Sequence, residues 1–156
     1  MPASPWRTFG APEPNGNFVV LLSYFPLKSY WRMPSLFRYT AQVEKQLASA
    51  QGLLGYSVLA RPLTKRFWTL SAWKNVDALQ AFVQHPPHVR LMAGLAPHMD
   101  KTKFVRWTVK GCDLPLRWDE PLWRLPLQSG RFRVTTDRLR SGRKRCHHDR
   151  VHYTAV

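Results

Sequence analysis

The sequence is short of acidic residues and of long apolar runs. Its 156 residues include 9 Asp and Glu against 24 Lys and Arg, which gives a formal net charge of +15. The longest apolar run, residues 18–22, is far too short to span a bilayer. Prolines fill the N-terminal stretch where a signal peptide would carry an apolar helix. We therefore expect a soluble, cytoplasmic protein with no membrane span.

Cysteines and catalytic motifs are also scarce. The two cysteines, Cys112 and Cys146, are too few for a disulfide framework, and the sequence leaves their state open. The chain has no Gly-rich phosphate loop, no nucleophile elbow and no Cys and His at metal-ligand spacing. The sequence therefore predicts no metal site. Its 44% of hydrophobic residues are enough for one packed domain and argue against global disorder.

The positive charge is unevenly distributed along the chain. Residues 1–123 have a net charge of +8, whereas the 33 residues 124–156 have a net charge of +7. The basic segment 126–156 shows no apolar periodicity and has few aromatic residues that could stack on bases. We expect it to be a disordered, solvated tail. Binding of nucleic acid through this tail is the alternative, and we do not favour it.

The order of the expected elements predicts a ferredoxin-like domain. Residues 1–16 are rich in Pro and Gly and are expected to form an extended leader. The expected strands cover residues 17–25, 54–61, 66–73 and 103–110. The expected helices are residues 34–49, a helix that Asn75 caps and that His85 ends, and a second short helix with His88, Leu91, Met92 and Leu95 on one side. This βαββαβ order predicts an α+β fold, with an antiparallel sheet and the helices on one face.

The second face of this sheet also needs a cover. Residues 18–22 are apolar at successive positions, so both sides of the first strand avoid water. A second copy of the sheet would cover the open face, which predicts a homodimer with two-fold symmetry. The alternative is that the aromatic-rich C-terminal segment folds back over this face.

A family resemblance appears in the stretch TLSAWKNVDALQAFVQHPPH, residues 69–88. A strand ending in Trp73 is followed by a short capped helix with Phe82 and then by His88. This pattern resembles the dimeric α+β barrel superfamily of the antibiotic-biosynthesis-monooxygenase type, and the likeness covers residues 17–125. The closing segment looks most like a subgroup of unassigned function, with a weaker likeness to the spheroidene monooxygenases.

The resemblance implies a dimeric α+β barrel but leaves the activity open. The superfamily includes cofactor-free oxygenases of phenolic polycyclic substrates, haem-degrading monooxygenases, haem-dependent aldoxime dehydratases and proteins without known catalysis. The haem-degrading branch has an Asn on its first strand, where this chain reads VLLSY at residues 20–24. Haem is therefore disfavoured as a cofactor, and whether any cofactor is used stays open.

In this fold we expect a site between the sheet and the helices, in a mostly apolar cavity with a few polar groups. His88 is the candidate acid, base or ligand, and the alternative is that it only caps a helix or lies on the surface.

Tyr39 and Ser23 could add hydroxyl groups. Arg66 and Arg106 could pair with Asp100 or Glu44, or could bind an anionic ligand, and the sequence does not separate these interpretations. The expected substrate-binding side chains are large and mostly aromatic: Trp73, Trp107, Tyr24, Phe82 and Met92. Each of these could equally be an ordinary core residue.

The sequence thus predicts a monooxygenase-like barrel that binds a hydrophobic or aromatic small molecule. The alternatives are a non-catalytic barrel that binds a ligand or a partner, and a nucleic-acid binder that acts through its basic tail. Whether the protein is an enzyme stays undecided at this point.

Overall fold

The computed structural model describes residues 3–118 and 154–155. Its strands form one sheet in the order β1-β3-β4-β2-β5-β6, and all neighbouring strands are antiparallel. The strands are β1 (Arg7–Thr8), β2 (Asn17–Pro26), β3 (Leu53–Arg61), β4 (Arg66–Trp73), β5 (Lys103–Lys110) and β6 (Thr154–Ala155). The basic segment 126–156 lies outside the described residues, except for the two residues of β6.

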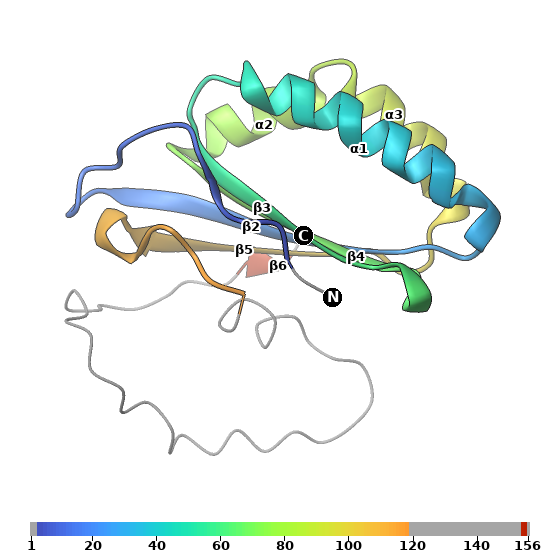
Figure 1. Cartoon of the computed structure of the whole chain (residues 1–156). Helices are drawn as coiled ribbons and strands as arrows, with labels where there is room; N and C mark the ends of the chain where they lie inside the picture. The colour runs from blue at the N-terminus through green and yellow to red at the C-terminus, as the bar shows by residue number, and fades with distance from the viewer. Residues whose placement is uncertain (1–2, 119–153, 156) are drawn as a thin grey trace, which may run out of the picture.

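Three α-helices in the described part of the chain lie on one face of this sheet (Figure 1). They are α1 (Met33–Ala48), α2 (Val76–Gln84) and α3 (His88–Leu95). The four central strands in the order β3-β4-β2-β5, with α1 after β2 and α2 and α3 after β4, confirm the ferredoxin-like α+β fold. None of these helices has the length and apolarity that crossing a lipid bilayer requires.

Local sequence explains where the helices begin and end. Pro34 lies in the first turn of α1, where its missing N–H costs no hydrogen bond. Asn75 caps α2, because its side-chain oxygen accepts a hydrogen bond from the backbone N–H of Ala78 at 2.8 Å. His85 takes an extended conformation before Pro86 and so ends α2. The signals at Asn75 and His85 set the bounds of α2, which contains Phe82, and of the turn that leads to His88.

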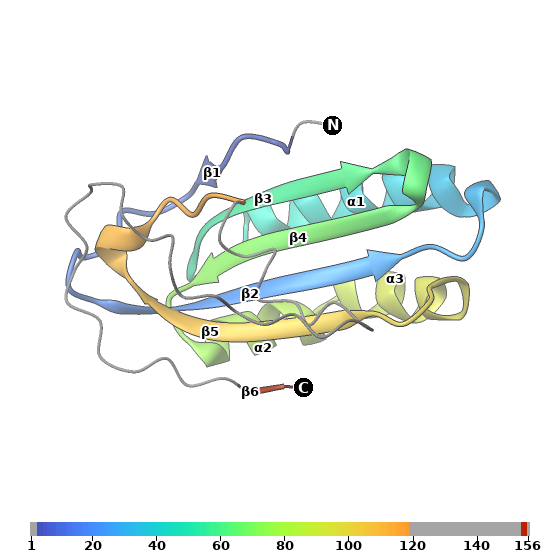
Figure 2. The ribbon, with the colours of Figure 1, turned by 90° about the horizontal axis from the view of Figure 1, so that it is seen from below.

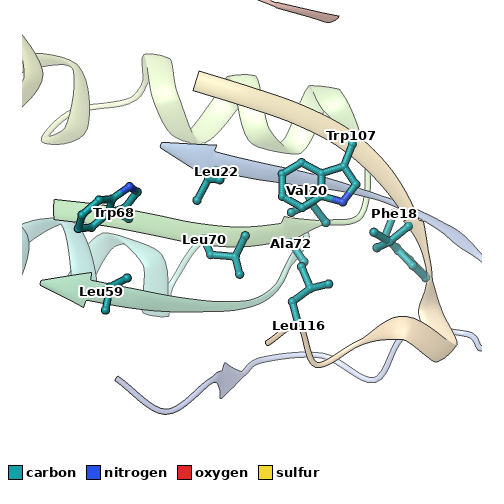
Figure 3. Packing of buried hydrophobic residues seen from close by; sticks show 10 residues of the cluster. Phe18, Val20, Leu22, Leu59, Trp68, Leu70, Ala72, Trp107 and Leu116 are labelled. Atoms are coloured by element: carbon teal, nitrogen blue, oxygen red, sulfur yellow. The ribbon is translucent and has the colours of Figure 1, made fainter. Parts of the chain in front are cut away.

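The side of the sheet away from the helices carries a large apolar cluster. Alternate residues of β2, namely Phe18, Val20 and Leu22, are buried there beside Leu70 and Trp107 (Figure 3). The residues between them on β2 face the helices. Both faces of β2 therefore carry apolar side chains, as its continuous apolar run indicates.

Two terminal segments pack against this cluster. Ala3 and Trp6 reach it from the leader, and Leu114, Leu116 and Trp118 reach it after β5. In Figure 1 the segment that follows β5 lies on the side of the sheet opposite the helices. Part of the C-terminal region therefore does fold back over the second face. The homodimer stays a prediction.

Short strands lie beside both outer strands of the central sheet (Figure 2). Arg7 and Thr8 of the leader pair with Tyr56 and Gly55 of β3. On the other edge, β6 pairs with Val105 and Arg106 of β5. Neither edge strand was expected, because two-residue strands show no periodicity in the sequence.

Candidate functional site

A cavity of about 540 Å³ lies between the sheet and the helices. The helices provide a largely apolar roof, which includes Leu36, Val43, Leu47, Phe82, Met92 and Leu95. A volume of this size suits a small organic molecule. The cavity has the position that the sequence predicts for a ligand site.

The sheet forms the floor of the cavity, and strand register fixes which residues lie together there. From β3 to β5, one cross-strand row contains Tyr56, Ser71, Leu21 and Arg106, and the next row contains Val58, Thr69, Ser23 and Phe104. These residues share one face because side chains alternate along a strand. The floor is therefore mixed, with hydroxyl groups at its centre and a guanidinium at its β5 side.

His88 lies at the start of α3 and lines the cavity. Its Nδ1 lies 3.1 Å from the carbonyl oxygen of Val83, so a protonated Nδ1 donates to this carbonyl and the Nε2 lone pair stays available. Burial lowers the pKa of the His88 ring, and the hydrogen bond to Val83 opposes this shift only in part. The ring is therefore neutral at pH 7 and able to accept a proton.

Trp73 and Phe82 connect the floor to His88. The side chain of Trp73 is 0% exposed, and its Nε1–H donates to Ser71 Oγ at 2.9 Å. Its ring centroid lies 5.1 Å from that of Phe82, which in turn lies 4.9 Å from that of His88. Together with Met92, these three predicted residues all line the cavity.

The structure places Tyr24 and Trp107 on the opposite face of the sheet. The ring of Tyr24 packs on Trp68 at 5.2 Å, and Trp107 is 4% exposed within the apolar cluster of that face (Figure 3). Trp107 directly follows Arg106 on β5, so the two side chains point to opposite faces. Neither aromatic residue lines the cavity, so this part of the prediction was wrong. The reason is that periodicity does not reveal which of two apolar strand faces meets the helices.

Several residues of the site were not singled out from the sequence. Thr69 and Ser71 lie on the floor, and Gln46 of α1 holds the turn between α2 and α3. Ser71 and Thr69 precede the strand-end Trp73 by two and four residues, so they lie on the same face of the sheet as Trp73. This spacing was the signal available in the sequence. Nothing local to Gln46 indicates its role, since its partners lie far along the chain.

Other chemistry finds little support in the described residues. Residues 3–118 contain no group of three or more His, Cys, Asp and Glu side chains that could hold a metal ion. Cys112 does not line the cavity and so provides no nucleophile there. The chemistry available to the cavity is that of His88, the floor hydroxyls, Tyr39, Glu44 and Arg106.

Comparison with known proteins gives a fold but no close relative. No protein-family model and no curated protein matches the sequence. A candidate monooxygenase from Lactobacillus acidophilus NCFM is similar in structure, with a TM-score of 0.54 and 11% identity over 64% of this chain and 47% of that chain. The matched region thus spans about half of the length of the Lactobacillus protein.

Shorter proteins match over most of their own length. A candidate antibiotic biosynthesis monooxygenase from Nitrosomonas europaea has a TM-score of 0.53 and 18% identity, over 58% of this chain and 88% of that chain. A further antibiotic biosynthesis monooxygenase has a TM-score of 0.52 and 12% identity, over 56% of this chain and 94% of that chain. At such identities the likeness concerns the fold. The protein therefore has the α+β fold of the antibiotic-biosynthesis-monooxygenase-like proteins, as the sequence resemblance predicts.

Proposed function

We propose that the protein binds a hydrophobic or aromatic small molecule in the cavity and oxygenates it, with His88 as the acid–base residue. The observation that carries this proposal is the apolar cavity of about 540 Å³ with a neutral histidine at its wall. The fold likeness to monooxygenase-like proteins supports it.

The chemistry requires one proton transfer at a defined atom. Nε2 of His88 accepts the proton of a phenolic or enolic hydroxyl, while Nδ1 stays bound to the Val83 carbonyl. The resulting electron-rich anion reacts directly with dioxygen. In the case of an anthrone, one oxygen atom becomes the new carbonyl and the other leaves as water. The apolar roof keeps water away from the anion.

A non-catalytic ligand-binding barrel is the second candidate. The observation that favours it is that His88 already has a structural role, because its backbone N–H and its Nδ1 both hold the turn between α2 and α3. A residue with that role needs no chemistry to explain its presence. The two candidates agree on ligand binding and differ only in turnover.

Ligand binding is tested by equilibrium dialysis of an anthrone with the wild type and with two tryptophan variants. Met92→Trp fills part of the cavity and should weaken binding by tenfold or more, whereas Leu63→Trp changes a side chain that is 82% exposed and outside the cavity, and should leave binding unchanged. Equal binding by both variants and the wild type would contradict the proposed site. Circular dichroism verifies that both variants are folded.

Turnover is tested by oxygen uptake and by formation of the anthraquinone. His88→Ala should retain binding and lose about 10²-fold or more in rate, as expected for loss of an acid–base group. His85→Ala is the matched control, because His85 is exposed three residues away and does not line the cavity. No oxygen uptake by wild type that binds the anthrone would leave the non-catalytic barrel as the function.

A further inference from the structure

The cavity contains a positive charge that no described carboxylate balances. Arg106 is the only Lys or Arg among the residues that line it, and no residue of the described chain forms an ion pair with its guanidinium. The side chain is only partly exposed. A guanidinium held against an apolar cavity favours an anionic group that can replace the lost water.

Glu44 also lines the cavity, but at its opposite side. Its carboxylate lies beside Tyr56, because it contributes with burial to raising the pKa of that phenol. In the cross-strand row, Tyr56 and Arg106 are separated by three interstrand steps, an estimated backbone distance of about 14 Å. The carboxylate and the guanidinium therefore mark opposite edges of the floor.

A buried hydroxyl lies between these edges. Ser23 is 3% exposed and lines the cavity, and its side chain has no hydrogen bond within the described chain. A buried hydroxyl normally has a hydrogen-bond partner. Without one, the cost of removing the hydroxyl from water is not offset. An oxygen atom of a ligand in the cavity would supply the missing partner.

Register brings this hydroxyl into range of Arg106. Leu21 is paired with Arg106, and Ser23 follows two residues later on the same face of β2. Such diagonal neighbours lie about 7–8 Å apart, a gap that the long Arg side chain can span together with one ligand oxygen group. Thr69 is directly opposite Ser23 on β4 and presents a second hydroxyl to the same point.

We propose that the ligand carries an anionic oxygen group, a carboxylate or a phenolate, that binds to the Arg106 guanidinium and the Ser23 and Thr69 hydroxyls. Its apolar body then lies against the helical roof. This inference rests on the proposed binding function and specifies its substrate class. It requires no participation of His88, which acts on the roof side of the ligand.

The test compares ligands that share one ring system and differ in charge. Anthracene-9-carboxylate, the neutral anthracene-9-methanol and an anthrol titrated at high pH are bound to the full-length protein, and the dissociation constants are measured by fluorescence. The wild type should bind the carboxylate or the phenolate about tenfold or more tightly than the alcohol. The arm with the larger preference identifies the anionic group.

Substitutions separate the guanidinium from general effects of charge. Arg106→Gln should remove the preference for the anion and leave binding of the alcohol unchanged. Arg106→Lys, which keeps the charge without the planar fork, should keep part of the preference. Arg66→Gln should keep all of it, because Arg66 is exposed on β4 and does not line the cavity.

Ser23→Ala gives an independent measurement. It should weaken binding of the anion severalfold without lowering the unfolding midpoint, because its hydroxyl has no hydrogen bond to lose within the described chain. Equal binding of anion and alcohol by the wild type, or a preference that survives in Arg106→Gln, would overturn the inference and leave the proposed function standing. Binding of none of these compounds would overturn both.

Discussion

The side-chain amide of Gln46 determines where His88 lies. Gln46 Oε1 accepts a hydrogen bond from the backbone N–H of His88 at 3.1 Å, and Gln46 Nε2 donates to the carbonyl oxygens of Phe82 and His85, each at 3.2 Å. One residue of α1 thereby satisfies backbone groups at the end of α2 and at the start of α3. The position of the candidate base depends on this contact between distant segments.

Replacing Gln46 should loosen the turn between α2 and α3. Gln46→Glu keeps an acceptor for the His88 N–H but loses the donor, so two carbonyl oxygens then face a carboxylate. We expect a loss of about 1–2 kcal/mol in the free energy of unfolding and faster amide exchange at residues 85–89. Urea unfolding and hydrogen exchange measure the two effects. Gln42→Glu, one turn earlier on the exposed side of α1, is the control and should change neither.

Acid should destabilise the protein through His88. Because burial lowers the pKa of His88 in the folded state, the unfolded chain binds the proton more readily. The contribution of His88 to stability is therefore complete above its unfolded pKa of about 6.5 and is lost as the pH falls below that value toward the folded pKa. Urea unfolding of wild type and His88→Gln at several pH values measures the difference between the two curves. Parallel curves would contradict the buried, neutral ring.

Two floor serines should respond differently to the same substitution. Ser71→Ala removes the acceptor of the Trp73 indole N–H, which is then left buried without a partner, and should cost about 1–3 kcal/mol in unfolding free energy. Ser23→Ala removes a hydroxyl that has no hydrogen bond in the described chain and should cost little. Thermal or urea unfolding compares the pair. Equal losses would show that the Trp73–Ser71 hydrogen bond contributes nothing of its own.

A methyl group at Gly55 should displace the leader from β3. A Cβ at this position would lie 2.6 Å from Trp6 Cε2 and 2.7 Å from the carbonyl oxygen of Arg7, too close for either to remain in place. Gly55→Ala should therefore expose residues 3–10 to limited proteolysis. Gly94→Ala is the matched control, since its Cβ would only touch Tyr39 Oη at 3.7 Å. Proteolysis at wild-type rate in Gly55→Ala would refute the packing of the leader.

The order and bounds of the elements follow closely from the sequence, for identifiable reasons. Elements begin or end at Pro26, Pro34 and Pro86. Between them, the spacing of apolar residues distinguishes helices from strands. The expected strands 66–73 and 103–110 coincide with β4 and β5, and the other central elements differ by one or two residues at their ends. Local chemistry decides these features, so a single sequence suffices for them.

The site was less accessible from the sequence, because it depends on which sheet face meets the helices. Trp73, Phe82, His88 and Met92 lie together since their motif spans one strand end and the helices after it. Tyr24 and Trp107 lie on the other face, and the apolar run of β2 contains no polar residue that would have marked it. The role of Gln46 depends on partners 36 to 42 residues away, which no local pattern reveals.

The short strands at the sheet edges restrict how copies of this protein could associate. The leader blocks the outer side of β3, where Ser4 also exchanges hydrogen bonds with the Val58 backbone, from its N–H to the carbonyl at 2.8 Å and from the Val58 N–H to its Oγ at 2.9 Å. β6 occupies part of the outer side of β5. Two copies cannot merge their sheets into one continuous sheet through these positions without first peeling off a terminal segment. Association through side chains of a sheet face or of the helices needs no such exchange. The terminal segments therefore favour these arrangements over edge-to-edge pairing of two sheets.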